Sequence, residues 1–114
     1  MVATSEKKVG NASVLSPTGR VDVETTPPLQ ERLLPLLGQA GAVVVIDFSG
    51  VSYISSSGLR ALMLGAKEAK AKGGKLAVCA LNETVSEIFR ISRFNQVVPV
   101  YADLNGALSA LTPT

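Results

Sequence analysis

The stretch from Ala42 to Phe48 constrains the fold more than any other part of the chain, because it is a nearly unbroken apolar run. Such a run is typical of a central strand in a parallel sheet that is covered on both faces. A second apolar run, from Lys75 to Leu81, predicts a neighbouring strand. Between the two runs, apolar residues recur at helical spacing, at Leu59, Leu62, Met63 and Ala66. Strands that alternate with helices predict an α/β fold.

The other elements complete this prediction. Turn residues at Pro17–Gly19 predict a hairpin between strands at Val9–Ser16 and Arg20–Val23. We further expect a helix from Thr25 to about Gly38, kinked or shortened by Pro35, a helix from Asn82 to about Arg93, a strand at Val97–Tyr101, and a short helix after Asp103. The expected fold is thus a mixed, mostly parallel central sheet of about five strands with an N-terminal β-hairpin and about four helices. Residues 1–114 form one domain in this prediction, with a disordered end at residues 1–7.

The chain contains no histidine, which excludes whole classes of enzyme. Neither a Ser-His-Asp nor a Cys-His nucleophile system can be assembled without one. A zinc site would have to combine one cysteine with carboxylates, an uncommon ligand set. We therefore expect no catalytic residue, no metal and no cofactor.

Charge and hydropathy also restrict the partners. The net charge is +2, with 11 basic and 9 acidic residues, and aromatic residues, which could stack on bases, make up only 4% of the chain. This balance predicts no direct contact with nucleic acid. No apolar run approaches the ~18 residues of a membrane helix, and the first residues lack the apolar core of a signal peptide, so we expect no membrane insertion. Cys79 is the only cysteine, so it cannot pair within the chain. We expect a cytoplasmic protein in which Cys79 is a buried core residue and not a reactive thiol.

Three consecutive serines, Ser55, Ser56 and Ser57, precede Gly58 at the start of the central helix. One of them can cap the helix by accepting a hydrogen bond from its first turn. A serine nucleophile lacks the G-x-S-x-G pattern and a histidine base, and a phosphate-binding loop lacks the GK[ST] sequence. A regulatory phosphoacceptor is the fourth reading, since the positive end of a helix stabilises an added anion.

Particular motifs carry a resemblance to a known family, and they span about residues 8–110. They are Gly19-Arg20-Val21-Asp22 with Thr25, the segment VVIDFSGVSYISSSGLRALM, and the segment AKAKGGKLAVCALNETVSEIF. With these motifs the chain resembles the anti-sigma factor antagonists of the STAS domain family. The resemblance implies that Ser57, or as second choice Ser56, accepts phosphate from a serine kinase that is also the anti-sigma factor. The unphosphorylated protein would bind this kinase, and a serine phosphatase would reset the switch.

The resemblance also implies a partner-binding surface, made of Asp22, Ser55, Ser56, Ser57, Gly58, Arg60 and Leu64. For Asp22, structural capping and partner contact both remain open. Asp47, at the end of the central strand, is expected to hold loop N–H groups. The alternative function is a STAS scaffold or transporter-associated subunit that binds its partner without phosphorylation.

Two positions depart from the family pattern. Ser55 stands where related chains often have Asp, and Arg93 stands where they often have Gly. The first change removes a negative charge beside the expected acceptor, and it bears on whether the switch still operates. The second is expected to reshape the turn before Phe94.

Overall fold

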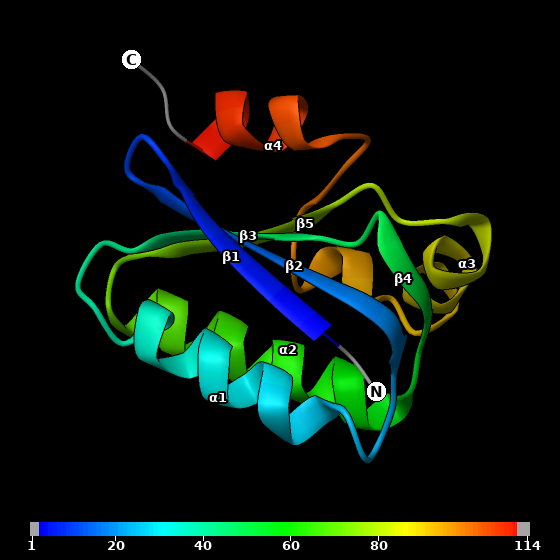
Figure 1. The fold of residues 1–114 in the computed structure, drawn as a ribbon. Helices are drawn as coiled ribbons and strands as arrows, with labels where there is room; N and C mark the ends of the chain where they lie inside the picture. Colours follow the sequence, from blue (N-terminus) through cyan, green and yellow to red (C-terminus); the bar gives the residue numbers. More distant parts are fainter. Residues whose placement is uncertain (1–2, 112–114) are drawn as a thin grey trace.

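The sheet is mixed and six-stranded, and helices cover both of its faces (Figure 1). The computed structural model describes residues 3–111. Helices α1 (Thr26–Leu37) and α2 (Ser56–Ala71) lie side by side on one face, whereas α4 (Leu104–Leu111) covers the other. Helix α3 (Glu83–Ile91) lies at the end of the molecule, beside the strand β4 (Gly50–Ile54). The predicted fold class is confirmed.

The main path of the sheet has the strand order β1-β2-β3-β5-β6. Only β1 and β2 are antiparallel, and the other pairs are parallel. The predicted last strand, Val97–Tyr101, is reduced to Val100 and Tyr101, because the chain is still turning at residues 97–99 after the 3-10 turn η1 (Phe94–Gln96). The strands of the main path are β1 (Ala3–Val9), β2 (Ala12–Val21), β3 (Val43–Asp47), β5 (Lys75–Cys79) and β6 (Val100–Tyr101).

The long strand β2 pairs with two different parallel neighbours. Its first part, Ala12–Leu15, pairs with β3, and its last part, Thr18–Val21, pairs with β4. The sequence pattern did not predict β4. A register shift between Gly19 and Arg20 marks the bend of β2 toward this branch. The serines therefore directly follow β4 and not the central strand β3.

Two predictions about the N-terminal region were wrong. The hairpin turns at Gly10-Asn11, and not at Pro17–Gly19, which lies inside β2. Residues 3–7 are not a disordered end, because they belong to β1 and pair with β2 along its length. The remaining residues of that predicted end, 1 and 2, lie outside the described residues.

The core has one part on each face of the sheet. The larger part joins β-strand residues to α1, α2 and α3, and the smaller one packs β3 and β5 against α4. Cys79 is fully buried in the smaller part, as predicted, and burial together with the charges of Asp47 and Asp103 raises the pKa of its thiol to about 11. Such a thiol stays protonated near neutral pH and is a poor nucleophile.

The buried face of α2 differs from the predicted one. Met63, expected in the core, is 39% exposed, whereas Ala61 is 3% exposed. Gly65 explains which face of α2 is buried, because a Cβ built at Gly65 would lie 3.1 Å from side-chain atoms of both Leu33 and Leu37 of α1. Small residues on α2 allow α1 to approach closely, so the larger Met63 is turned outward. Helix α1 itself continues through Pro35 to Leu37, so the proline does not cut it short.

Candidate functional site

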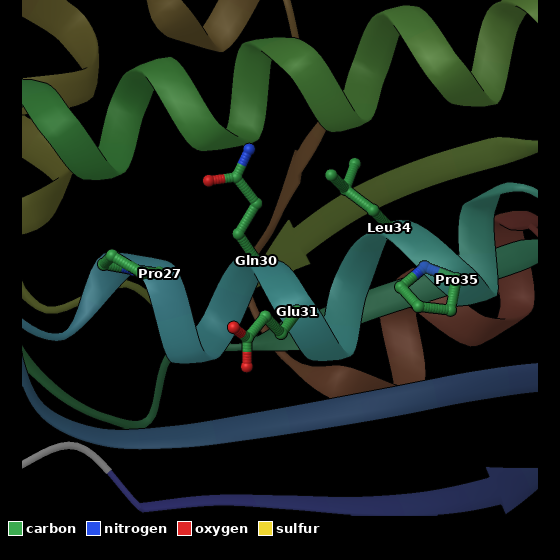
Figure 2. Close-up of a pocket in the computed structure, with 5 residues that line it drawn as sticks. All are labelled: Pro27, Gln30, Glu31, Leu34 and Pro35. Carbon is green, nitrogen blue, oxygen red and sulfur yellow. The ribbon is translucent and has the colours of Figure 1, made fainter.

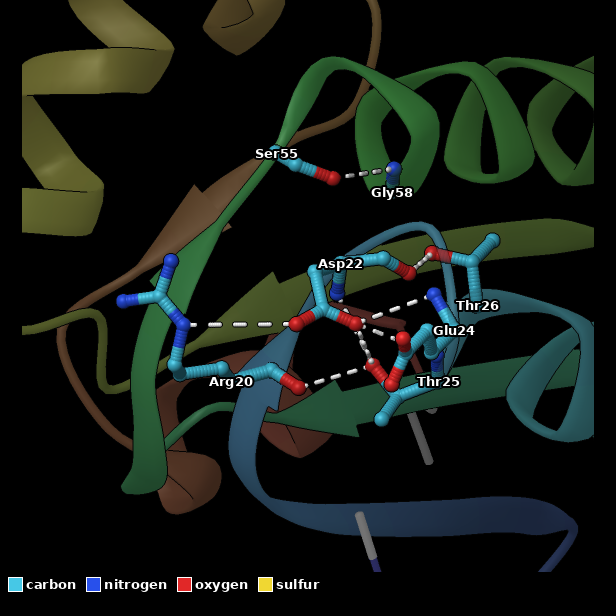
Figure 3. Close-up of polar contacts among 7 residues, drawn as sticks. All are labelled: Arg20, Asp22, Glu24, Thr25, Thr26, Ser55 and Gly58. Atoms are coloured by element: carbon cyan, nitrogen blue, oxygen red, sulfur yellow. Dashed lines mark hydrogen bonds and ion pairs between the residues drawn. The ribbon is translucent and has the colours of Figure 1, made fainter. Parts of the chain in front are cut away.

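Ser55 connects β4 to α2 and caps the helix. Its backbone N–H donates to the carbonyl of Val21 at 2.8 Å, which fixes the end of β4 against β2. Its backbone is extended, and its hydroxyl accepts a hydrogen bond from the N–H of Gly58 at 3.4 Å (Figure 3). The capping reading of the serines is therefore confirmed for Ser55.

Ser56 and Ser57 occupy the first two positions of α2. Ser56 is exposed and Ser57 is half-buried. Within residues 3–111, neither hydroxyl has a hydrogen-bond partner. Their backbone N–H groups belong to the first helical turn, where a helix provides no acceptor of its own. A negatively charged group on either side chain would lie close to these donors and to the positive end of the helix dipole.

Gly58 lets the helix start directly on the strands beneath it. A Cβ at this position would lie 2.6 Å from Cγ1 of Ile54 and 2.9 Å from Cγ1 of Val21. Both neighbours are themselves buried in the core. The absence of a side chain at Gly58 therefore determines how close the serines come to the sheet.

Asp22 organises the turn between β2 and α1. Its carboxylate accepts hydrogen bonds from the backbone N–H groups of Glu24 at 3.1 Å and Thr25 at 3.2 Å. In return, the hydroxyl of Thr25 accepts from the N–H of Asp22 at 2.8 Å (Figure 3). These contacts confirm a structural capping role for Asp22, whereas its contact with a partner stays a prediction.

Arg20 lies on the surface between Asp22 and β4. Its guanidinium carbon is 4.5 Å from the centroid of the Tyr53 ring, and its Nε is 4.0 Å from Oδ2 of Asp22. The side chain remains 64% exposed, so these contacts orient it without removing it from solvent. The surface beside the serines thus carries a guanidinium group and a carboxylate close together.

The pKa of Asp22 lies below its ordinary value of 3.8. Desolvation acts to raise it, but the N–H groups of Thr25 and Glu24, the Thr25 hydroxyl and the charge of Arg20 together outweigh that effect. A lowered carboxyl pKa in the folded state stabilises the fold above the unfolded-state pKa, and this contribution is lost as the pH falls through the folded-state value.

Asp22→Asn should therefore reduce stability more at neutral pH than in acid. We expect the urea midpoint of the variant to lie below that of the wild type at about pH 6, and the difference to shrink as the pH falls below about 4. Urea unfolding across this pH range measures the effect. A difference that stays constant with pH would show that the charge of Asp22 does not contribute.

Other predicted site residues are distributed along α2 and the strand ends. Asp47 accepts a hydrogen bond from the N–H of Ser49 at 2.9 Å, which confirms its predicted role in the loop. Arg60 and Leu64 are both exposed, and the exposed fraction of Leu64 is 45%. Asp22 and the serines come together where β2, β4 and α2 meet, and Arg60 and Leu64 continue this surface along the helix.

A groove beside the serines was not predicted from the sequence. It has a volume of about 280 Å³ and lies between α2 and the segment that links α3 to η1. Its walls combine residues far apart in the chain, so hydrophobic periodicity does not reveal it. The lining residues are Ser56, Leu59, Arg60, Met63, Ser92 and Phe94.

A second hollow, of about 460 Å³, lies along α1 (Figure 2). It is lined by Pro27, Gln30, Glu31, Leu34 and Pro35, all from one helix. Glu31 is its single ionisable group, so the hollow offers little for specific recognition.

Residues 3–111 contain no group of three or more histidine, cysteine, aspartate or glutamate side chains that could hold a metal ion. In this range no helix has the length and apolar character needed to span a membrane.

Comparison with known proteins gives consistent matches. The STAS domain profile matches residues 4–107. BtrV of Bordetella bronchiseptica, whose name describes a candidate anti-sigma factor antagonist, is 34% identical over 92 residues, or 81% of this chain and 79% of BtrV. The anti-sigma-B factor antagonist of Bacillus subtilis is 33% identical over 90 residues, or 79% of this chain and 82% of that protein.

A solved structure matches the fold closely. The crystal structure of an anti-sigma factor antagonist from Mycobacterium paratuberculosis has a TM-score of 0.88 to this chain and 24% sequence identity. The match covers 97% of this chain and 94% of the other. The similarity therefore extends over the whole sheet and its helices.

Proposed function

The chain belongs to the STAS domain family, and on that basis we propose that it is an anti-sigma factor antagonist controlled by phosphorylation. In its unphosphorylated form it binds an anti-sigma factor that is also a serine kinase, and this binding releases a sigma factor. Relatives at 34% and 33% identity that bear the name of this role support the proposal. The observation that carries it is a pair of serines with unbonded hydroxyls at the accessible start of α2.

Phosphorylation of Ser57 is the proposed off-switch. The kinase transfers the terminal phosphoryl group of ATP to Oγ of Ser57, and ADP and the hydroxyl proton leave. The modification adds about −1.5 to −2 charges. Free N–H groups and the helix dipole accommodate this charge in the free protein. A bound partner would have to cover and desolvate it, so binding fails while the fold persists. A serine phosphatase restores the hydroxyl.

Ser55 in place of the aspartate common in the family is compatible with this switch. Serine and aspartate are both good N-cap residues, so the exchange preserves the cap on Gly58. It removes one negative charge next to the acceptor. The phosphate on Ser57 therefore meets less repulsion here than it would beside a carboxylate.

Mapping of the phosphate tests this proposal directly. Incubation of the full chain with its cognate serine kinase and ATP, followed by peptide mass spectrometry, should place phosphate on Ser57. Ser57→Ala should abolish the modification, and Ser56→Ala serves as the matched control that retains it. Phosphate on none of the three serines would refute the switch. If the chain still bound its partner in that case, a phosphorylation-independent scaffold would be favoured.

A further inference from the structure

The groove beside Ser56 points to a second contact for the same partner. We infer that it receives an apolar side chain from an acidic segment of the anti-sigma factor, and that Arg60 and Arg93 recognise the acidic groups. The inference rests on the proposed function, because it extends the binding surface from α2 to the turn between α3 and η1. None of the residues that the family resemblance implies as partner-binding lies on that turn.

The groove is suited to a side chain and not to a separate small molecule. Its volume of about 280 Å³ is at the lower limit of small-molecule sites, which usually have about 300–1,000 Å³ and enclose most of their ligand. Leu59 and Met63 form its apolar wall on α2, and Phe94 forms the wall on η1. Binding energy in protein interfaces is concentrated where an apolar anchor fills a pocket of this kind.

The charge around the groove favours an acidic partner. Arg60 lines it, and Arg93 lies between two lining residues, Ser92 and Phe94. Both arginines are exposed, and within residues 3–111 neither forms an ion pair. Arg90 differs, because its charge is already matched by Glu87. Unpaired guanidinium groups bind carboxylates strongly through paired hydrogen bonds.

The backbone of Arg93 gives an independent reason to assign a role to its side chain. Its φ of 59° and ψ of 24° lie in the left-handed region, which favours glycine. The turn around it is well formed, since the N–H of Arg93 donates to the carbonyl of Arg90 at 3.1 Å. Glycine would build this turn with less strain. Non-glycine residues held in this conformation cluster at functional sites, which supports a role for the side chain of Arg93.

The groove also links partner recognition to the switch. Ser56 lines the groove, and Ser57 follows it in the first turn of α2. A phosphate on Ser57 would place negative charge near the edge that an acidic segment must approach. Repulsion of that segment and attraction of Arg60 to the phosphate would both weaken binding. The arginines thus make the interface more sensitive to the phosphate.

Binding of the purified cognate anti-sigma factor to the unphosphorylated full chain tests the inference. Arg93→Gly removes the charge and relieves the backbone, so it should fold at least as well as the wild type. We expect it to raise Kd by at least about fivefold, with a smaller effect at high salt. Met63→Gln, at an exposed position, should also weaken binding. Lys8→Gln is the matched control for the loss of a positive charge. Lys8 lies opposite Ser13 in the sheet, near the start of the parallel strands, whereas the groove lies near their carboxyl ends.

Failure of the proposed function and failure of the groove inference give different results. If the wild-type chain does not bind the anti-sigma factor, the proposed function is wrong and the inference falls with it. If the wild type binds and both groove variants bind as well as Lys8→Gln, the groove is not a contact, although the proposed function stands. Thermal unfolding of each variant shows whether a loss of binding reflects a loss of fold.

Discussion

Ser57→Asp is expected to weaken binding to the anti-sigma factor by about 30-fold or more, which is typical for an unpaired charge in an interface. The carboxylate would occupy the second position of α2, where it mimics part of the charge of a phosphate. The fold should remain intact, because an acidic residue in the first turn of a helix interacts favourably with the dipole. Ser57→Ala removes the hydroxyl without adding charge and should bind as the wild type does.

Isothermal calorimetry with the three proteins measures this difference. Ser109→Asp is a suitable control, because Ser109 is exposed on α4, which covers the opposite face of the sheet. It makes the same chemical change at a distance from the serines and should leave Kd unchanged. Equal affinities of Ser57→Asp and Ser57→Ala would exclude Ser57 from the interface.

Gly58→Ala is expected to lower the free energy of unfolding by about 1–3 kcal/mol, the usual cost of overpacking a core. The new methyl group would lie within 3.0 Å of Ile54 and Val21, which are buried and have stiff, β-branched side chains. The start of α2 must therefore move away from β2 and β4. Because the same movement displaces Ser56 and Ser57, partner binding should weaken as well.

Gly38→Ala is the matched control for this substitution. Gly38 has an ordinary φ of −72°, and a Cβ there would have its nearest neighbour at 3.4 Å. The same added methyl group should therefore be neutral or slightly stabilising, since it reduces the freedom of the unfolded chain. Urea unfolding of both variants gives the comparison. Equal stability of the two would mean that α2 is not packed tightly on the strands at Gly58.

The periodicity of the sequence predicted the alternation of strands and helices. It did not predict elements whose structure depends on pairing with a strand that is distant in the sequence. β4 is short and contains polar residues, and it becomes a strand because β2 extends beyond β3 and offers a free edge. Pro17 resembled a turn residue, yet it lies where the β3 ladder has ended at Leu15 and the β4 ladder begins at Thr18. A proline is tolerated in β2 there because no parallel neighbour requires its missing N–H.

The candidate site was predictable in part. The position of the serines at a helix start followed from the sequence, whereas the assignment of the cap to Ser55 required the hydrogen bond to Gly58. The spacing of apolar residues predicts Met63 in the core because it gives weight to large side chains, although small residues determine how closely α1 approaches α2. The one sequence signal for the groove was Arg93 at a position where the family often has glycine.

The division of β2 between two ladders has a consequence for how such a domain diversifies. The central strands β3 and β5 join β2 through its first half, while the serine segment joins it through residues 18–21. Substitutions on the exposed side of β4 and of the start of α2 therefore leave the ladders of β3 with β2 and β5 intact. Their buried residues Val51, Ile54 and Leu62 share one core with the central strands, so a change of partner is compatible with the fold only where it is made on the exposed residues.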